Sequence, residues 1–321
     1  MSHPEQTSIV SRPVPAGNGV YVIDTLYQRP GMAASHLIVE DGHAAFVDTG
    51  AAPAAPRLLA ALSELGLHRE QVEFLFLTHV HLDHAGGAGQ LMGALPNARA
   101  VLHPRGARHL VDPAKLIEGS IAVYGEEKFS RLYGEILPIA PDRVIATTDG
   151  QRLQLGSRNF EFIDTPGHAR HHHCVVDLDY CEIYSGDVFG ICYHEFDSVA
   201  GPFIFPTTTP VQFEPDAMLA SVDRLLSYRP KRIYQTHFGP VSEVARLAAD
   251  LRELIGEFVG IAQRHATAPD RTARIAADIF ACLDSKLDAH GYPGRTENRH
   301  ALLDSEVGLN TAGLEVWLVR I

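Results

Sequence analysis

Three histidines and one aspartate occur within six positions of the segment Thr78-His79-Val80-His81-Leu82-Asp83-His84-Ala85-Gly86-Gly87. In an extended backbone, alternate side chains point to the same side, so His79 and His81 are predicted to bind one metal ion. Asp83 and His84 follow where the chain must turn, and they are predicted to face a second metal. Imidazole nitrogen and carboxylate oxygen are ligands that zinc and similar divalent metals prefer. An amphipathic surface would explain one or two of these residues, but not four together.

Three further candidate ligands stand at the ends of predicted strands. His168 comes after a strand at 160–165, Asp187 ends a strand at 181–187, and His237 follows a strand at 232–236. Taken singly, His168 or His237 is more often an ordinary polar residue than a ligand. Folds usually build sites from loops gathered at one edge of a rigid sheet, and these three residues are therefore predicted to complete the metal site.

The first half of the chain is predicted to open with antiparallel strands. Short β-branched or aromatic runs occupy residues 20–26, 35–40 and 43–49, and Asp41-Gly42 between the last two is a hairpin signal. A helix is expected at 56–65, where leucines repeat on one face, and a buried strand at 73–78.

A similar order of elements returns later, with a strand at 181–187, a helix at 216–227 and a strand at 232–236. In both halves a strand ends in an aspartate, and the strand after the helix ends in Thr-His. This weak internal repeat favours two sheets, each covered by helices and packed face to face. The predicted fold class is therefore α/β, a four-layer αββα sandwich.

Two helical segments are expected beside this sandwich. Residues 105–140 are predicted to form an insertion that covers the site, and the pattern becomes helical again from 243 onward. We therefore divide the chain into an αββα metal-binding domain at 1–242, which includes the insertion, and a helical C-terminal extension at 243–321.

Composition excludes several classes of function. The net charge of −12 argues against a nucleic-acid ligand, since such affinity rests on Lys and Arg contacts to phosphate. Four cysteines without C-x-x-C spacing are read as free thiols, and neither a signal peptide nor a membrane span is expected. The expected location is cytoplasmic, without a membrane partner. The oligomeric state is left open, with a homodimer as one option.

Residues around the ligands receive more modest predictions. His172 lies four residues after His168 and is expected to hydrogen-bond to a ligand without binding metal, whereas His171 and His173 are expected to be exposed or structural. Aromatic residues are more often core than pocket. Four of them are nevertheless predicted to contact the substrate, namely Tyr124, Tyr133, Tyr193 and Phe203.

Four motifs resemble the metallo-β-lactamase superfamily over roughly residues 20–240: H-x-H-x-D-H at 79–84, T-P-G-H at 165–168, S-G-D at 185–187 and the late His237. The resemblance implies the metallo-β-lactamase fold with a dinuclear site along one edge. It implies that one metal takes His79, His81 and His168, that the other takes Asp83, His84 and His237, and that Asp187 bridges the two.

The resemblance is greatest to the glyoxalase II and lactonase-like branch, because true β-lactamases generally lack the bridging aspartate found here at position 187. The chain shows no clear basic cluster for the carboxylates of glutathione, so the thioester substrate is left open. Persulfide dioxygenases share the motif but use one iron ion. An iron-dependent, oxygen-handling enzyme of that kind, a β-lactam or phosphodiester hydrolase, and a non-catalytic binding module are the alternatives.

The mechanism expected from two metals is hydrolysis. Two cations that share a water lower its pKa from about 15.7 toward neutrality, so a metal-bridging hydroxide is expected to attack an ester, lactone or thioester carbonyl. Asp83 is the predicted catalytic residue, which orients the nucleophile and relays a proton to the leaving group. Two divalent ions are the expected cofactors, zinc first, with iron or manganese as alternatives. A small molecule is the expected substrate.

Overall fold

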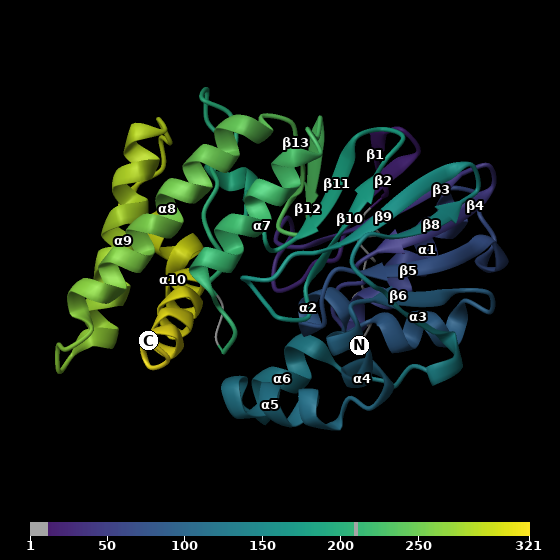
Figure 1. The fold of residues 1–321 in the computed structure, drawn as a ribbon, viewed down its shortest axis with the longest axis horizontal. Coiled ribbons are helices and arrows are strands. Elements are labelled where there is room, and N and C mark those ends of the chain that lie inside the picture. Colours follow the sequence, from purple (N-terminus) through teal and green to yellow (C-terminus); the bar gives the residue numbers. More distant parts are fainter. Residues whose placement is uncertain (1–11, 209–210) are drawn as a thin grey trace, which may run out of the picture.

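The computed structural model describes residues 12–208 and 211–321. Two mixed β-sheets pack face to face and helices cover the outer face of each, as Figure 1 shows. This arrangement confirms the predicted αββα sandwich.

Within the described part of the chain, the first sheet contains seven strands that are neighbours in sequence order. The first four pair antiparallel and the last four pair parallel. The strands are β1 (Val14–Gly17), β2 (Val20–Asp24), β3 (Ala34–Glu40), β4 (His43–Val47), β5 (Val72–Leu77), β6 (Arg99–Leu102) and β7 (Val144–Ala146).

The second sheet has the strand order β13-β12-β11-β10-β9-β8, and β11 and β12 are the parallel pair among its described strands. The helix α7 (Pro215–Ser227) connects these two strands. The strands are β8 (Gln151–Leu155), β9 (Arg158–Asp164), β10 (His173–Asp177), β11 (Glu182–Gly186), β12 (Arg232–Gln235) and β13 (Gly239–Val241).

The predicted hairpin at Asp41-Gly42 joins β3 to β4, with Glu40 paired to His43. Both turn residues have positive φ, 51° for Asp41 and 81° for Gly42. This is the type I′ geometry that matches the twist of antiparallel strands, and Asp-Gly is among the sequences that adopt it readily. The turn therefore fixes the register of the two strands.

Aromatic and branched side chains fill the space between the sheets. The Phe76 ring on β5 lies 5.4 Å from that of Phe160 and 5.1 Å from that of Phe162, both on β9 of the opposite sheet. All three are essentially inaccessible to solvent. Burial of one such side chain stabilises the fold by about 1.5–3 kcal/mol, so this layer holds the two sheets together.

Helices complete the outer layers. On the first sheet, α1 (Ala55–Glu64) and α3 (Ala88–Ala94) bury leucines against β4 and β5. On the second sheet, α7 and α8 (Val244–His265) pack against β11 and β12. The helices α9 (Arg271–Ala289) and α10 (Thr296–Leu318) follow and belong to the same hydrophobic cluster.

The segment expected to be a helical insertion contains α4 (Pro104–Val111), α5 (Ala114–Tyr124) and α6 (Glu126–Tyr133). Phe129 and Tyr133 of α6 are buried, whereas no residue of α5 is. In the part of the chain that the structure describes, no helix is both long and apolar enough to cross a lipid bilayer.

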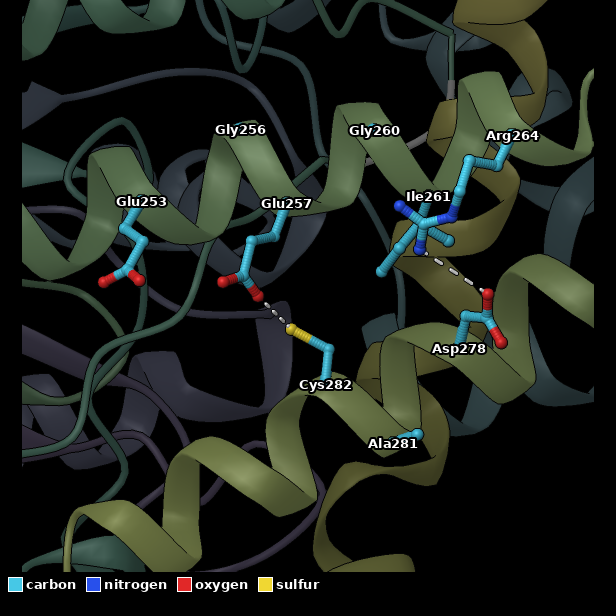
Figure 2. A pocket seen from close by; sticks show the side chains of 9 residues that line it. All are labelled: Glu253, Gly256, Glu257, Gly260, Ile261, Arg264, Asp278, Ala281 and Cys282. Carbon is cyan, nitrogen blue, oxygen red and sulfur yellow. Dashed lines mark hydrogen bonds and ion pairs between the residues drawn. The ribbon is translucent and has the colours of Figure 1, made fainter.

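A cavity of about 640 Å³ lies between α8 and α9, as Figure 2 shows. Cys282 donates a hydrogen bond through Sγ to Glu257 Oε2 at 2.7 Å, and Arg264 faces Asp278 across the same groove. No group of potential metal ligands is found there among the described residues. The lining of this cavity includes none of the seven predicted metal ligands.

Arg158 is a buried cation that links the two sheets. Its guanidinium donates from Nε to Asp177 Oδ2 at 2.5 Å within the second sheet and from Nη1 to the carbonyl of Asn18, between β1 and β2. Only 1% of Arg158 is exposed. Removing one partner of a buried ion pair leaves the other charge uncompensated in the interior.

We therefore expect Arg158→Ala to lower the free energy of unfolding by about 3–5 kcal/mol, measured by urea denaturation. Arg152→Ala is the matched control, because its side chain is 68% exposed while it pairs with Glu161. That change should cost less than about 1 kcal/mol. Equal losses in the two variants would contradict the assigned role of Arg158.

Candidate metal centre

All seven predicted ligands follow the ends of strands at one edge of the sandwich. The chain leaves β5 into the loop that carries His79 and His81, and α2 (Leu82–Ala85) then presents Asp83 and His84. A Cβ at Gly86, which follows α2, would lie 3.2 Å from the Cα of Ala51. Glycine therefore permits the close approach of this corner to the loop after β4. The other ligands, His168, Asp187 and His237, follow β9, β11 and β12.

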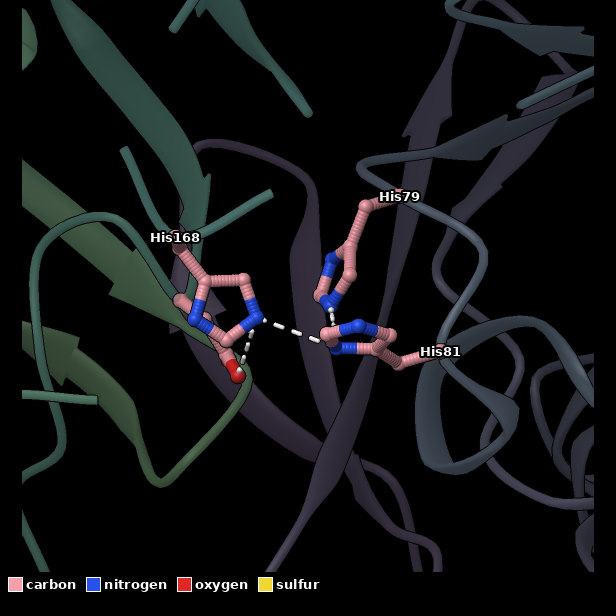
Figure 3. Close-up of side chains that lie close together, drawn as sticks. His79, His81 and His168 are labelled. Atoms are coloured by element: carbon pink, nitrogen blue, oxygen red, sulfur yellow. Dashed lines mark hydrogen bonds and ion pairs between the residues drawn. The ribbon is translucent and has the colours of Figure 1, made fainter. Parts of the chain in front are cut away.

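The first ligand group consists of His79, His81, His168 and Asp187, whose ligand atoms all lie within 4.8 Å of one another. His81 Nδ1 is 2.9 Å from His79 Nε2 and 3.0 Å from His168 Nε2, and Figure 3 shows the three rings converging. Ligands bound tetrahedrally at the zinc–nitrogen distance of 2.0–2.1 Å are about 3.3 Å apart. The separations observed here are close to that spacing.

The second group consists of Asp83, His84 and His237. His237 Nε2 lies 3.3 Å from His84 Nε2 and 3.4 Å from Asp83 Oδ2. Asp187 faces both groups, since its Oδ1 is 3.2 Å from His84 Nε2 and its Oδ2 is 3.5 Å from His168 Nε2. Among the described residues, the buried Oδ1 makes no hydrogen bond, so a cation between the groups would satisfy an otherwise unsatisfied oxygen.

The electrostatics of the first group favour neutral imidazoles. Burial lowers the pKa of His79 well below its ordinary value, and the neighbouring imidazoles lower it further. Burial likewise lowers the pKa of His81 to about 3. Neutral imidazole has the free lone pair that a metal ion requires. These side chains are therefore in the protonation state of a ligand.

In the second group, neighbouring charges outweigh the effect of burial on the pKa values. Burial alone would lower the pKa of His84, but Asp187 and Asp83 raise it well above its ordinary value. Burial alone would raise the pKa of Asp83, but His84 and His237 lower it to about 2. Positive charge is therefore stabilised here, between two ionised carboxylates.

In two ligand histidines, His168 and His237, the Nδ1 atom contacts an oxygen atom within hydrogen-bonding distance. His168 Nδ1 lies 3.1 Å from Thr207 Oγ1, and His237 Nδ1 donates to the carbonyl oxygen of Met32 at 2.6 Å. A proton on Nδ1 leaves Nε2 free to bind a metal, and such contacts also fix the orientation of the ring.

Asp48 is a site residue that the sequence analysis missed. Its Oδ2 lies 3.0 Å from His84 Nδ1 and accepts a hydrogen bond from Thr236 Oγ1 at 2.8 Å, while its Oδ1 accepts one from the Thr78 amide at 2.8 Å. The carboxylate thus orients one ligand and joins the two strand ends that carry His79 and His237. The internal repeat contained the signal, because Asp48 follows β4 as Asp187 follows β11.

His172 and His173, in the run after His168, make structural hydrogen bonds, whereas the ring of the buried His171 lies 5.6 Å from that of the ligand His81. The His172 Nε2 accepts a hydrogen bond from the Asp187 amide at 3.3 Å, and its Nδ1 lies 2.8 Å from Thr165 Oγ1. His173 Nε2 donates to the carbonyl of Leu77 at 2.9 Å. His172 therefore positions the residue that faces both ligand groups.

A cavity of about 590 Å³ opens on His81, Asp83, Asp187 and His237. Three of the four predicted substrate contacts line it, namely Tyr124, Tyr133 and Tyr193.

Phe203 does not belong to the cavity lining. It is buried, and its ring packs 6.1 Å from that of Phe196, 6.4 Å from that of Phe205 and 5.4 Å from that of His290. The expectation that Phe203 contacts substrate is therefore corrected: the aromatic run after Asp187 packs into the core instead.

The C-terminal helix α10 lines the cavity, which the sequence did not predict. Ser305, Glu306, Gly308, Leu309 and Asn310 all contribute to the wall. Sequence periodicity shows that a helix has a buried face, but it does not show which part of the molecule that face contacts.

The comparisons with known proteins agree with this geometry. The family model described as the metallo-β-lactamase superfamily matches residues 28–237. The chain belongs to the metallo-β-lactamase superfamily. A metallo-β-lactamase fold-containing protein from Sulfurisphaera tokodaii is 28% identical over 177 residues, which cover 54% of this chain and 63% of that protein.

A hydroxyacylglutathione hydrolase from Stenotrophomonas maltophilia is 31% identical over 151 residues, which cover 47% of this chain and 43% of the relative. The chain thus spans about half the length of the curated relatives that it matches.

Solved structures show how far the shared fold extends. A metallo-β-lactamase family protein from Thermus thermophilus superposes with a TM-score of 0.67 at 22% identity, covering 95% of both chains. A β-lactamase domain protein from Burkholderia ambifaria gives a TM-score of 0.65 at 18% identity, covering 99% of this chain and 92% of that one. The likeness in fold therefore reaches beyond the residues that the family model matches.

The contact between Asp48 and His84 predicts a specific effect on metal binding. In Asp48→Asn the amide has the same shape but no charge, so we expect metal affinity to fall about 10–100-fold while the fold is kept. Competition with a chromogenic chelator measures the affinity, and circular dichroism checks the fold. Asp142→Asn, an exposed position, is the matched control. Unchanged affinity in Asp48→Asn would contradict the role given to this carboxylate.

Proposed function

We propose that this protein hydrolyses a small ester, lactone or thioester by attack of water on its carbonyl carbon, with the help of two divalent cations. Zinc is the expected metal. The proposal rests mainly on one observation. Two adjacent groups of ligand atoms share Asp187 and open on a single cavity.

The donor set is suited to two cations. His79, His81 and His168 would hold one, Asp83, His84 and His237 would hold the other, and Asp187 would contact both. Such ions lower the pKa of a bound water and polarise a substrate carbonyl. A mononuclear iron enzyme would need only one of the two groups, so the number of metal ions bound per chain distinguishes the two readings.

Asp83 is the proposed catalytic residue. It lines the cavity, and its Oδ2 lies 3.4 Å from His237 Nε2 and 3.8 Å from His84 Nε2. From this position the carboxylate can orient a water at the ligand cluster, accept its proton and pass that proton to the leaving group. The tyrosines on the cavity wall exclude solvent, and the Tyr27 hydroxyl donates a hydrogen bond to that of Tyr133 at 3.1 Å.

The cavity supports a compact substrate. Its volume lies within the range of small-molecule pockets, about 300–1,000 Å³, and its lining mixes aliphatic and aromatic side chains with a few polar groups. Two cations, Lys115 and Lys128, also line it. The hydroxyacylglutathione hydrolases among the relatives favour a thioester over the other two substrate classes.

Metal removal tests whether hydrolysis by this protein requires divalent cations. Dialysis against a chelator should abolish hydrolysis, and zinc should restore it at about two equivalents per chain, since the structure holds two ligand groups. Elemental analysis and a panel of lactones, thioesters, β-lactams and phosphodiesters provide the readouts. Full activity without metal, or turnover of the phosphodiester alone, would overturn the proposal. One iron per chain together with oxygen consumption would favour the alternative class.

The role of Asp83 makes a separate prediction. Asp83→Asn should keep the fold but lower kcat about 10²–10⁴-fold on the best substrate of the panel, because the amide cannot accept the proton. Steady-state kinetics on metal-loaded protein measure the effect, with Asp142→Asn as the control. Near-normal turnover by Asp83→Asn would count decisively against proton relay by this side chain.

A further inference from the structure

Glu306 is a buried carboxyl group without a cationic partner. It lies on α10, is 5% exposed, and forms no ion pair with any described Lys, Arg or His. The other buried charged residue on the same helix behaves differently, since Arg299 contacts Asp284 at 2.8 Å and Asp288 at 2.7 Å. Burying an unpaired carboxyl costs several kcal/mol, which makes Glu306 a candidate functional residue.

One oxygen of Glu306 is fixed and the other is unused. The Tyr193 hydroxyl donates to Oε1 at 3.0 Å. Tyr193 is itself held in place, because the Arg29 guanidinium lies 4.6 Å from its ring centre and the Phe205 ring packs at 5.6 Å. Within residues 12–208 and 211–321, Glu306 Oε2 makes no hydrogen bond. The carboxyl group is thus oriented without being saturated.

Glu306 lines the cavity that opens on the metal ligands. Burial raises the pKa of its carboxyl group, and Asp187 and Asp83 add to that effect while His237 opposes it. Ligands of both predicted metals therefore lie within its electrostatic reach. A bound substrate in the cavity would lie in the same field.

The helix that carries Glu306 is anchored to the metal centre. One turn further on, Asn310 Oδ1 accepts hydrogen bonds from the Thr208 amide and hydroxyl, both at 2.7 Å. The preceding residue, Thr207, contacts the ligand His168. The distance between Glu306 and the ligand cluster is therefore set by a short chain of hydrogen bonds.

We propose that Glu306 determines substrate specificity, with its free Oε2 hydrogen-bonding to a hydroxyl or amide group on the acyl part of the substrate. This inference rests on the proposed acyl hydrolase function and adds to it a requirement for a polar substituent. A site built to bond such a group discriminates against an analogue that lacks it, because the buried carboxyl would then stay unpaired.

The test compares thioesters of equal chain length, butanoyl against 2-hydroxybutanoyl and 3-hydroxybutanoyl. The zinc-loaded protein should prefer one hydroxylated substrate at least about tenfold in kcat/KM, and Glu306→Leu should reduce that ratio at least about tenfold. The double variant Glu306→Leu/Tyr193→Phe removes the hydroxyl that would otherwise be left unpaired, so it replaces the single variant if that one does not fold. Glu297→Leu, at an exposed position in the first turn of α10, is the matched control and should keep the ratio.

Calorimetric binding of the three free acids provides a readout that needs no turnover. The acid of the preferred hydroxylated substrate should bind to the parent protein more tightly than butanoic acid. The Glu306→Leu variant should show no such preference. The inference is overturned if the parent protein and Glu306→Leu show the same kcat/KM ratio between hydroxylated and plain substrates and the same binding preference. Absence of hydrolysis for every acyl compound would instead overturn the proposed function, and the binding data would then decide the role of Glu306 alone.

Discussion

The carboxylate of Asp187 lies between two groups of imidazoles, and all of these side chains are buried or nearly so. Removing so many ligand groups from water is costly unless cations compensate for the lost hydration. A pair of divalent ions would satisfy both oxygens of Asp187 and the inward nitrogens of the histidines. The local structure is consistent with this requirement, because the imidazoles of the first group are held neutral and the carboxylates of Asp83 and Asp187 are ionised.

The rest of the sandwich keeps these ligands at fixed distances. The strands β5, β9, β11 and β12 bring the four ligand-bearing segments to one edge, and the aromatic layer between the sheets keeps the two halves in register. Asp48 then ties the strand ends to each other, since it contacts His84, Thr78 and Thr236 at once. The cavity wall depends less on the sheets, because α5, α6 and α10 supply nearly half of the residues that line it.

The sequence predicted the elements that depend on local chemistry. The Asp-Gly hairpin, the leucine-rich helix α1 and the aromatic strand β5 each follow from a few neighbouring residues, and the structure confirms them. The repeat of strand, helix and strand was enough to predict two sheets. The structure also brings together the seven predicted ligands.

Features that depend on contacts between residues far apart in the chain could not be predicted from the sequence. The contact of Glu306 with Tyr193 joins residues 113 positions apart, and no periodicity encodes such a pairing. For the same reason Phe203 looked like a pocket residue, although the structure packs it against Phe196 and His290. Aromatic character is shared by core and pocket, and only tertiary structure separates them.

An anomalous-scattering map of metal-loaded crystals tests the central claim most directly. The account predicts two peaks with Asp187 between them, one about 2.0–2.2 Å from the side chains of His79, His81 and His168, the other at the same range from Asp83, His84 and His237. A map with no peak at these side chains, or with the side chains turned away from one another, would contradict it.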